Sequence, residues 1–249
     1  MTDHVQISTE DGVLRITLNR PEKKNALTRA MYFAMVDALE QADRADTVRV
    51  VLLTGSGDSY TAGNDISDFQ RSAPAEGPSG ASVFGDRLVR FTKPIVAAVN
   101  GLAVGIGTTM LLHCDLVYAS EAARFRLPFV DLGLVPELAC SLLLPQLAGH
   151  HRASELLLLG RFFSAEEASA IGIVNHVLPA ADLLPRALEA AQTIAAKPPQ
   201  AVAQTRALIK GDVEPVLARK AWESAVFEER LRSPEAQAIF AAFLARASS

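Results

Sequence analysis

The chain has 249 residues, 49% hydrophobic and 21% charged, which excludes a disordered, collagen-like or small disulfide-rich protein and predicts one large domain or a domain with an appendage. Acidic side chains number 28 and basic ones 24, so the net charge of −4 offers no basic excess for a nucleic-acid backbone. The two cysteines, Cys114 and Cys140, lie in apolar stretches without CxxC spacing, and we expect small buried side chains there.

Neither a signal peptide nor a membrane span is expected. Residues 1–12 lack the basic end and the apolar run of a signal peptide. The segment 94–114 carries no charged residue and is long enough to span a bilayer, but glycine, asparagine and threonine interrupt it. We interpret it as a buried strand, a turn at Asn100-Gly101 and a helix, and we expect a cytoplasmic protein.

Short apolar and β-branched runs predict the strands. In chain order they lie at 5–9, 13–18, 48–54, 95–99, 115–119, 124–127 and 172–178. Asp11-Gly12, between the first two, is typical of a hairpin turn. The third run is continuously apolar from Val50 to Leu53, which indicates a strand buried on both faces, as in parallel sheets.

Capping residues and helical periodicity predict the helices. Thr28 is expected to cap the first of them, Pro136 to begin another, and Ser164 to Glu167 to form a capping box at a third. Residues 71–85, rich in Pro, Gly and Ser, predict a loop that is either a lid or a tolerated insertion. Beyond Pro179 only helices are predicted, at 182–196, 200–209, 215–231 and 234–246.

Two segments after predicted strands have the composition of ligand-binding loops. In Tyr60 to Ile66, small residues allow backbone N–H groups to approach a ligand, and Asn64 and Asp65 favour a helix cap. In Asn100 to Thr109, a glycine-rich turn is expected to open an apolar helix whose first amides suit an oxyanion. The alternatives are an ordinary capped helix for the first segment and close helix–strand packing for the second.

A third segment, Pro128 to Glu137, places an acid after a proline at the expected helix start. Glu137 either complements the helix dipole or serves as a reactive carboxylate among apolar residues such as Leu134 and Val135. Burial would raise its pKa and the helix terminus would lower it. The histidines are dispersed and no HExxH or GxSxG pattern is present, so the sequence does not support metal ligation or a catalytic triad.

Together and in this order, the three segments resemble those of the crotonase (enoyl-CoA hydratase/isomerase) superfamily. Further matching pieces lie along nearly the whole chain, at Arg20-Pro21, Asn25-Ala26-Leu27, Cys114 to Ala119, Ser164 to Ala168 and Gly172-Ile173-Val174. The resemblance implies an α/β fold, a crotonase-like ββα spiral with a helical C-terminal region. It further implies an acyl-CoA-binding and catalytic core at 1–180, a trimerisation region at 181–249, and a homotrimer or a hexamer of two trimers.

The resemblance also implies which residues act on a thioester. Two backbone N–H groups hold the thioester oxygen in this family, and by motif position they belong to Asn64 and Ile106, the latter replacing the usual glycine. The glutamates with which hydratases activate water correspond to Thr109 and Phe129, neither of which is a suitable base. Glu137 falls where the monofunctional Δ3,Δ2-enoyl-CoA isomerases place their single catalytic glutamate. Dienoyl-CoA isomerases also have that acid, but they add a second at the place of Phe129.

Residues that line the CoA and acyl parts of the substrate are implied in the same way. They are Lys24, Ala26, Ala62, Gly63, Asp65, Ile66, Gly105, Thr109 and Phe129. Phe243 and Arg246 match a C-terminal aromatic–basic pair that can reach the CoA of a neighbouring subunit. For Lys24 the alternative is a solvated surface charge, and for the terminal pair it is packing of the last helix at a trimer interface.

The expected function is the isomerisation of 3-enoyl-CoA to trans-2-enoyl-CoA in fatty-acid degradation, through an oxyanion-stabilised dienolate with Glu137 as the proton shuttle. The expected partners are the acyl-CoA substrate and further copies of the chain, without cofactor, metal, nucleic acid or membrane. Two alternatives stay open. One is an enoyl-CoA hydratase or another crotonase-type acyl-CoA reaction, with water held by Thr109 or Asp131. The other is a non-catalytic subunit that binds CoA esters.

Overall fold

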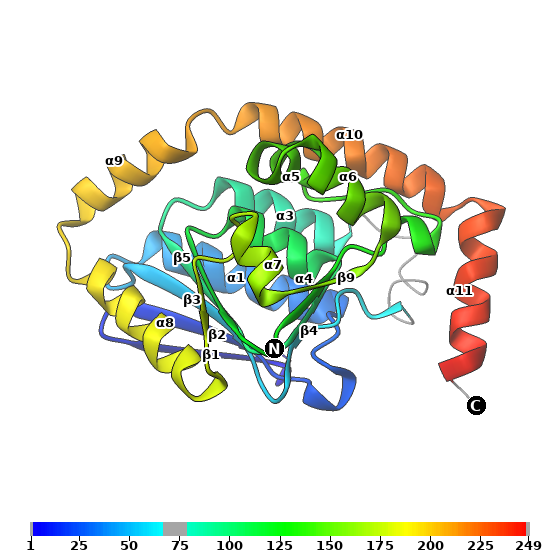
Figure 1. Ribbon diagram of the computed structural model, residues 1–249. Helices are drawn as coiled ribbons and strands as arrows, with labels where there is room; N and C mark the ends of the chain where they lie inside the picture. The colour runs from blue at the N-terminus through cyan, green and yellow to red at the C-terminus, as the bar shows by residue number, and fades with distance from the viewer. Residues whose placement is uncertain (1, 67–78, 248–249) are drawn as a thin grey trace.

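A mixed sheet of six strands, in the order β1-β2-β3-β5-β7-β10, forms the larger layer of the protein (Figure 1). The structure, a computed structural model, describes residues 2–66 and 79–247, with only the backbone at 243, 244, 246 and 247. The strands are β1 (Val5–Glu10), β2 (Val13–Leu18), β3 (Val50–Gly55), β5 (Ile95–Val99), β7 (Leu116–Ser120) and β10 (His176–Leu178). β1 and β2 are antiparallel, and every other neighbouring pair is parallel.

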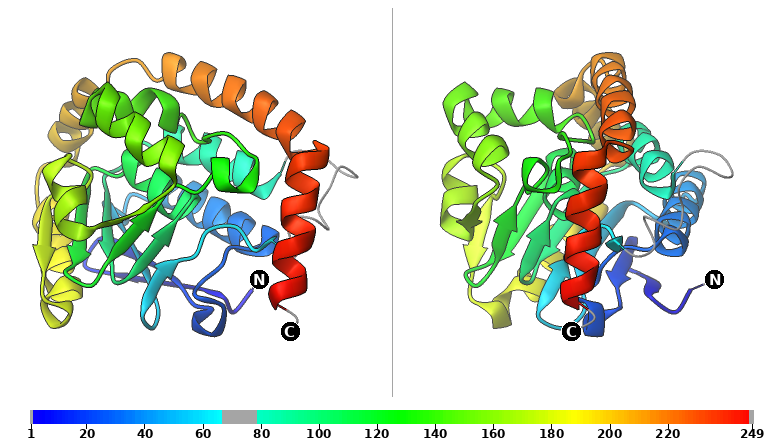
Figure 2. Two further views of the ribbon diagram at one scale, coloured as in Figure 1. Left: turned by 45° about the vertical axis from the view of Figure 1, so that its right-hand side comes forward. Right: turned by 90° about the vertical axis from the view of Figure 1, so that its right-hand side faces the viewer.

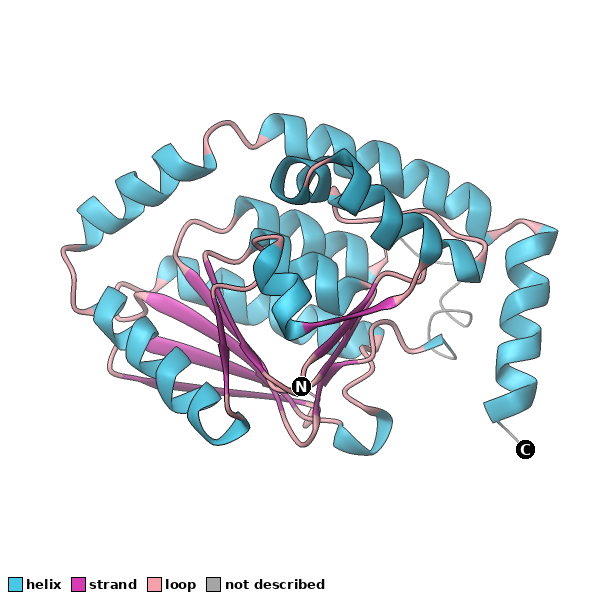
Figure 3. Ribbon diagram, viewed as in Figure 1, coloured by secondary structure: helices cyan, strands magenta, loops and turns pink. Residues whose placement is uncertain are grey.

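A second, smaller sheet has the order β4-β6-β8-β9. Its strands are β4 (Ser59–Thr61), β6 (Leu102–Val104), β8 (Arg124–Arg126) and β9 (Phe162–Ser164). The first three are parallel to one another, and β9 is antiparallel to β8. Each of β4, β6 and β8 follows directly on a strand of the larger sheet, so the chain repeats a strand–strand–helix unit. Figure 3 shows the two sheets converging at one end.

Helices cover the sheets and form the whole C-terminal region. The helices are α1 (Arg29–Arg44), α3 (Gly80–Arg90), α4 (Ile106–Thr109), α5 (Cys140–Ala148), α6 (His150–Leu159), α7 (Ala165–Ala170), α8 (Ala180–Ala195), α9 (Pro199–Lys210), α10 (Glu214–Leu231) and α11 (Pro234–Ala247). Single 3-10 turns lie at Pro21–Lys23, Met110–His113 and Val130–Leu132. Within the described residues, no helix is long and apolar enough to cross a membrane.

β3 has apolar partners on both of its faces, as the sequence predicts. Val51 and Leu53 belong to the cluster that includes Met35 of α1, whereas Val50 and Leu52 pack in a second cluster with residues of α8. All four β3 side chains are at most 4% exposed. Burying a Val or Leu side chain contributes about 1.5–3 kcal/mol, which makes this strand the centre of the core.

The local signals at helix ends and turns are confirmed. Asp11-Gly12 joins β1 and β2, which pair in register from Glu10 opposite Val13. The Thr28 hydroxyl accepts the N–H of Met31 at 3.3 Å and caps α1. Ser164 forms the predicted capping box with Glu167 at the start of α7. The four helices predicted beyond Pro179 correspond to α8 through α11.

The loop predicted at 71–85 is wrong over its last residues, because α3 begins at Gly80. Gly80 and Gly85 of α3 serve close packing and not flexibility. A Cβ at Gly85 would lie 2.6 Å from Cδ1 of Leu138, and one at Gly80 would lie 3.0 Å from Cβ of Tyr32. Residues 71–78 lie outside the described part of the chain.

Three other local predictions are wrong. The short strand β6 follows the Asn100-Gly101 turn, so the predicted helix begins only at Ile106. The helix expected at Pro136 begins at Cys140. The strand expected at 172–178 is confined to β10, and β4, β6 and β9 were not predicted as strands.

The C-terminal helices extend across the body of the protein. Figure 2 shows α10 running along one end of the molecule and α11 descending along one side. α10 contacts α3 and α5, and α11 contacts the 3-10 turn at Val130–Leu132. The last helices therefore pack on the core.

Candidate active site

The loops that follow β4 and β6 touch each other. The two strands are parallel neighbours, so both loops leave the same edge of the small sheet. A Cβ at Gly63, whose φ is +87°, would lie 2.7 Å from the carbonyl oxygen of Val104. A Cβ at Gly107 would lie 2.6 Å from Cγ2 of Thr61. Glycine at these two positions therefore allows the two predicted oxyanion loops to come together.

The backbone groups next to Asn64 and Ile106 form hydrogen bonds, but the N–H groups of these two residues do not. The Leu27 N–H donates to the Gly63 carbonyl at 2.7 Å, and the Asp65 N–H donates to the Leu27 carbonyl at 2.9 Å. Ile106 is the first residue of α4, where an N–H has no carbonyl to bond within the helix. Across residues 2–66 and 79–247 neither amide donates a hydrogen bond, so both keep their donor capacity.

The side chain of Asn64 is held by Tyr32 of α1. The Tyr32 hydroxyl donates to Oδ1 of Asn64 at 2.5 Å, and its ring lies against Phe84 of α3. Burial, and secondarily the charge of Glu137, raises the pKa of Tyr32 well above its ordinary value, so the hydroxyl keeps its hydrogen. Tyr32 is not identifiable from the sequence, because the apolar spacing of α1 already explains its burial.

Glu137 lies in the loop ahead of α5, and not in the first turn of a helix as predicted. Thr109 of α4 donates to Oε1 of Glu137 at 2.5 Å. The next two residues, Leu138 and Ala139, have φ values of +58° and +57°. This left-handed conformation costs about 1–2 kcal/mol per residue outside glycine. The loop around Glu137 must therefore be held by its surroundings.

The acid at the N-terminus of α5 is Glu223 of α10. It accepts the N–H of Ala139 at 2.6 Å and that of Ser141 at 2.8 Å. Glu223 therefore fills the helix-dipole role that is the alternative for Glu137 in the sequence. Nothing in the sequence around Glu223 distinguishes it from the other acids of its helix.

The pKa of Glu137 is shifted toward neutral pH. The pKa of Glu137 is raised to about 7, with burial as the largest cause and the charge of Glu223 acting in the same direction. The hydrogen bond from Thr109 and the charge of Lys220 lower it. Because its pKa lies close to neutral, the carboxyl can act both as a base and as an acid.

Glu137 and Asn64 line one pocket of about 60 Å³ between the core and α10. The described residues that line it are Asn64, Ser79, Ala81, Ser82, Glu137, Leu138, Lys220, Ser224, Phe227 and Glu228. α10 thus supplies one wall, which the expected division into a catalytic core and a trimerisation region did not include. Phe129, which the resemblance implies to line the substrate, is buried in the core and is not among these lining residues.

The residues predicted for the CoA site fall on two adjoining segments. The N–H of Ala62 donates to the carbonyl of Lys24 at 2.9 Å, so residues 24–27 run beside residues 62–66. The side chain of Lys24 is exposed and pairs with Asp58 at 2.6 Å. Gly105, with φ of +56°, stands directly before Ile106 in the second oxyanion loop.

Arg20 ties these segments together. Its guanidinium donates to Asp65 at 2.6 Å and to the carbonyl of Ala26 at 3.1 Å. The two side chains of this ion pair are only 15% and 12% exposed. The carboxylate of Asp65 is therefore bound by the protein itself, and Asp65 contributes to the site through the shape of its loop. Ile66, the last described residue before 79, packs against the core.

One further candidate lies away from this pocket. Asp131 pairs with Arg126 at 3.0 Å near the surface and is not among the described lining residues. This position does not favour Asp131 as the holder of a reactive water. Phe243 and Arg246 lie on α11, but their side chains are outside the described part of the structure.

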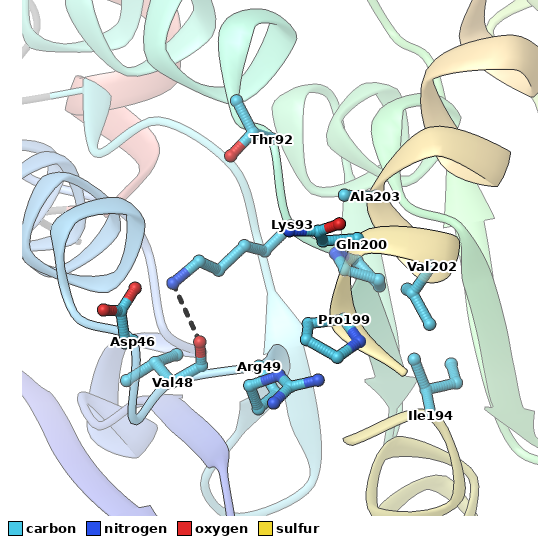
Figure 4. A pocket seen from close by; sticks show the side chains of 11 residues that line it. Asp46, Val48, Arg49, Thr92, Lys93, Ile194, Pro199, Gln200, Val202 and Ala203 are labelled. Carbon is cyan, nitrogen blue, oxygen red and sulfur yellow. Dashed lines mark hydrogen bonds between the residues drawn. The ribbon is translucent and has the colours of Figure 1, made fainter. Parts of the chain in front are cut away.

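A separate pocket of about 330 Å³ lies between the core and α9 (Figure 4). At its wall, the ammonium of Lys93 donates to the carbonyls of Ala42, Ala45 and Val48 at 2.6–2.8 Å. These three bonds close the end of α1 and use the whole donor capacity of the lysine. Among the described residues, no group of three metal-binding side chains is present here or elsewhere.

Comparison with known proteins places this site in a family. The sequence model of the enoyl-CoA hydratase/isomerase family matches residues 8–248. The chain is 38% identical to enoyl-CoA delta isomerase 2 of Rattus norvegicus over 212 residues, 83% of this chain and 54% of that protein. It is also 38% identical to 1,2-epoxyphenylacetyl-CoA isomerase of Escherichia coli (strain K12) over 207 residues, 80% of this chain and 78% of that protein.

A solved structure is similar over the whole chain. The crystal structure of enoyl-CoA hydratase/isomerase from Pseudoalteromonas atlantica T6c has a TM-score of 0.94 and 44% identity, covering 98% of both chains. The chain spans about half the length of the rat relative, and relatives of equal identity carry different reactions in their names. The two mixed sheets and the helical C-terminal region are the crotonase fold, and the chain belongs to the enoyl-CoA hydratase/isomerase (crotonase) family.

Proposed function

We propose that this chain converts 3-enoyl-CoA thioesters to trans-2-enoyl-CoA, with Glu137 as the only acid–base group. The observation that carries the proposal is the pairing of Glu137 with Thr109. Thr109 occupies one of the two positions where the family's hydratases have a glutamate, and its hydroxyl is bonded to Glu137. Neither position at which the family's hydratases have a glutamate carries an acid here, so Glu137 is the carboxyl that we propose for proton transfer.

The reaction needs a single group that moves one proton over a short distance. Glu137 removes a proton from C2, and the electrons of that C–H bond pass into a dienolate whose charge rests on the thioester oxygen. The same carboxyl then delivers the proton to C4, and the double bond settles between C2 and C3. With a pKa of about 7, Glu137 has comparable driving force in both directions.

The amides of Asn64 and Ile106 are the proposed donors to the thioester oxygen. Each such donor contributes about 3–4 kcal/mol to the stability of the transition state when it is fixed in place. The Tyr32 hydroxyl orients Asn64, and the contact of Gly107 with Thr61 orients the turn at Ile106. These preset positions support an enolate chemistry, which all reactions proposed for this site would share.

The proposed CoA path follows the segments 24–27 and 62–66, with Lys24 at its exposed end. In the proposed assembly, a homotrimer or a pair of trimers, Phe243 and Arg246 would reach the CoA of a neighbouring subunit. Large apolar side chains exposed on the helices support this assembly. They are Leu158, Leu159, Leu208, Ile209 and Trp222, each at least 64% exposed.

The test compares 3-hexenoyl-CoA with crotonyl-CoA in the wild type and in Glu137→Gln. The variant keeps the size and hydrogen bonding of the side chain but has no base. We expect isomerisation to fall by about 10²–10⁴-fold or more, with acyl-CoA binding little changed. Glu121→Gln, an exposed acid outside the pocket, is the matched control and should keep wild-type turnover.

The other two outcomes would each favour one of the alternative functions. Strong hydration of crotonyl-CoA by the wild type, little affected by Glu137→Gln, would overturn the isomerase proposal in favour of a hydratase. Tight thioester binding without either activity would instead indicate a non-catalytic CoA-ester-binding subunit.

A further inference from the structure

α10 places two charged side chains in a nearly enclosed position beside the candidate active site. Lys220 is 5% exposed and Glu223 is 6% exposed. Lys220 lines the pocket itself. Its ammonium forms an ion pair with Asp86 of the neighbouring helix α3 at 3.0 Å. Glu223 is directed to the backbone of the loop that carries Glu137.

We propose that Glu223 is a positioning residue of the active site. By accepting the N–H groups of Ala139 and Ser141, it holds the left-handed turn that presents the Glu137 carboxyl to the substrate. The proposal rests on the proposed role of Glu137 in isomerisation. It adds that the C-terminal region takes part in catalysis through the placement of the base.

The turn after Glu137 is anchored on two sides. Glu223 binds the two N–H groups, at 2.6 and 2.8 Å. On the other side, Nε2 of His113 lies 2.9 Å from the carbonyl oxygen of Leu138. Burial lowers the pKa of His113 to about 4, so the ring is neutral at pH 7 and acts here as a neutral donor. Among the described residues, Glu223 is therefore the charged anchor of this turn.

A carboxylate suits this task better than any other side chain. The two N–H groups lie two residues apart, and each meets a different oxygen of Glu223. A glutamine has one oxygen and would direct its NH₂ group at the second N–H. An aspartate keeps both oxygens and the charge but is one methylene shorter. Glu223→Gln therefore tests the loss of the charge, and Glu223→Asp tests the length of the side chain.

The charge of Glu223 also acts on Glu137. The other groups around Glu137 are Lys220 from α10, the hydroxyls of Thr109 and Tyr32, Cys140 from α5, and Glu228, which lines the pocket from α10. Asp86 of α3 faces Lys220. The negative charge of Glu223 disfavours the ionised form of Glu137, so removing that charge lowers the pKa of Glu137.

The test measures kcat and KM for 3-hexenoyl-CoA across pH in the full chain for Glu223→Gln and Glu223→Asp. We expect Glu223→Gln to lower kcat by about 10- to 100-fold with KM changed by less than about threefold, because the base is misplaced while the CoA contacts remain. The acid limb of the kcat–pH profile of Glu223→Gln should move to lower pH. Glu223→Asp should lower kcat less and leave that limb in place. Glu229→Gln removes the same charge from an exposed position of α10 and should match the wild type.

A change in stability alone would not move the acid limb. If Glu223→Gln matched Glu229→Gln in both kcat and acid limb, the proposal would be wrong. Crystal structures of wild type and Glu223→Gln give a second readout that does not depend on activity. A rearranged turn at Leu138 and Ala139 supports the proposal, even if the wild type proves not to isomerise 3-enoyl-CoA and the proposed function fails. An unchanged turn with the Thr109–Glu137 hydrogen bond intact overturns it.

Discussion

Thr109 opposes the effect of burial on the protonation of Glu137 through one hydrogen bond. The hydroxyl donates to the carboxylate and so stabilises the ionised form, which lowers the pKa against the effect of burial. A hydrogen bond to a charged group contributes about 1.5–3 kcal/mol, and 1.36 kcal/mol corresponds to one pKa unit. Losing this contact is therefore expected to change the ionised fraction of Glu137 near pH 7.

Thr109→Val should raise the pKa of Glu137, because valine has the same shape but donates no hydrogen bond. The acid limb of the kcat profile for 3-hexenoyl-CoA should move up by about one to two pH units. Thr205→Val, on the exposed side of α9, is the control and should keep the wild-type profile. A limb that stayed in place would show that the contact does not control the titration of Glu137.

At this scale the sequence locates Glu137 but not the residues that position it. Its motif is visible in the residues themselves, and the resemblance to the family implies that Thr109 and Phe129 replace two acids. Tyr32 and Glu223 come from helices distant in the sequence, and each looks like an ordinary member of its helix. Contacts made only by folding leave no local pattern, which is why these two residues were not predicted.

Among the elements, the parallel pair β4 and β6 defines the geometry of the two oxyanion loops. The pair is short and carries a register irregularity between Ser59 and Thr61. The relative position of the two oxyanion loops therefore depends on the glycine contacts just beyond the strands. A side chain at Gly107 would push against Thr61, in the preceding strand of the pair.

Gly107→Val should displace the turn that aims the Ile106 amide, while the rest of the sheet keeps its pairing. We expect kcat to fall by about 10²–10³-fold, the usual effect of losing one oxyanion donor. Gly211→Ala tests the loss of a glycine at a positive φ where no atom lies within 4 Å of the new Cβ. Near-normal turnover in Gly107→Val would mean that the turn serves packing alone.

The elements that the sequence predicts well are those with local causes. Thr28 and Ser164 cap helices through side-chain bonds within a single turn, and Asp11-Gly12 closes a hairpin of adjacent strands. The left-handed turn at Leu138 and Ala139 was missed because neither residue favours that conformation. It exists because α10 and His113 bind its backbone, and this cause lies outside the segment.

For the whole molecule, the exposed apolar side chains predict association. Leu208 and Ile209 on α9 are 84% and 79% exposed, and Trp222 on α10 is 64% exposed. Large apolar side chains grouped on a surface mark an interaction site. Phe240 of α11, in contrast, is buried within the chain.

Light scattering should give a mass three or six times the 26.6 kDa of the chain. Leu208→Asp with Ile209→Asp should lower that mass, because two buried charges would oppose the contact. Gln204→Asp with Thr205→Asp adds the same charge at exposed polar positions of α9 and should leave the assembly intact. A monomeric mass for the wild type at micromolar concentration would contradict the proposed assembly.

The wall that α10 adds to the pocket has a consequence for the order in which the protein becomes functional. The ribosome releases Asn64, Ile106 and Glu137 well before Lys220 and Glu223, which follow some eighty residues later in the chain. Until α10 has emerged and docked, the turn after Glu137 lacks its charged anchor, and the pocket is open on one side. A nascent chain stalled after residue 180 would thus carry every residue of the proposed chemistry without being an enzyme.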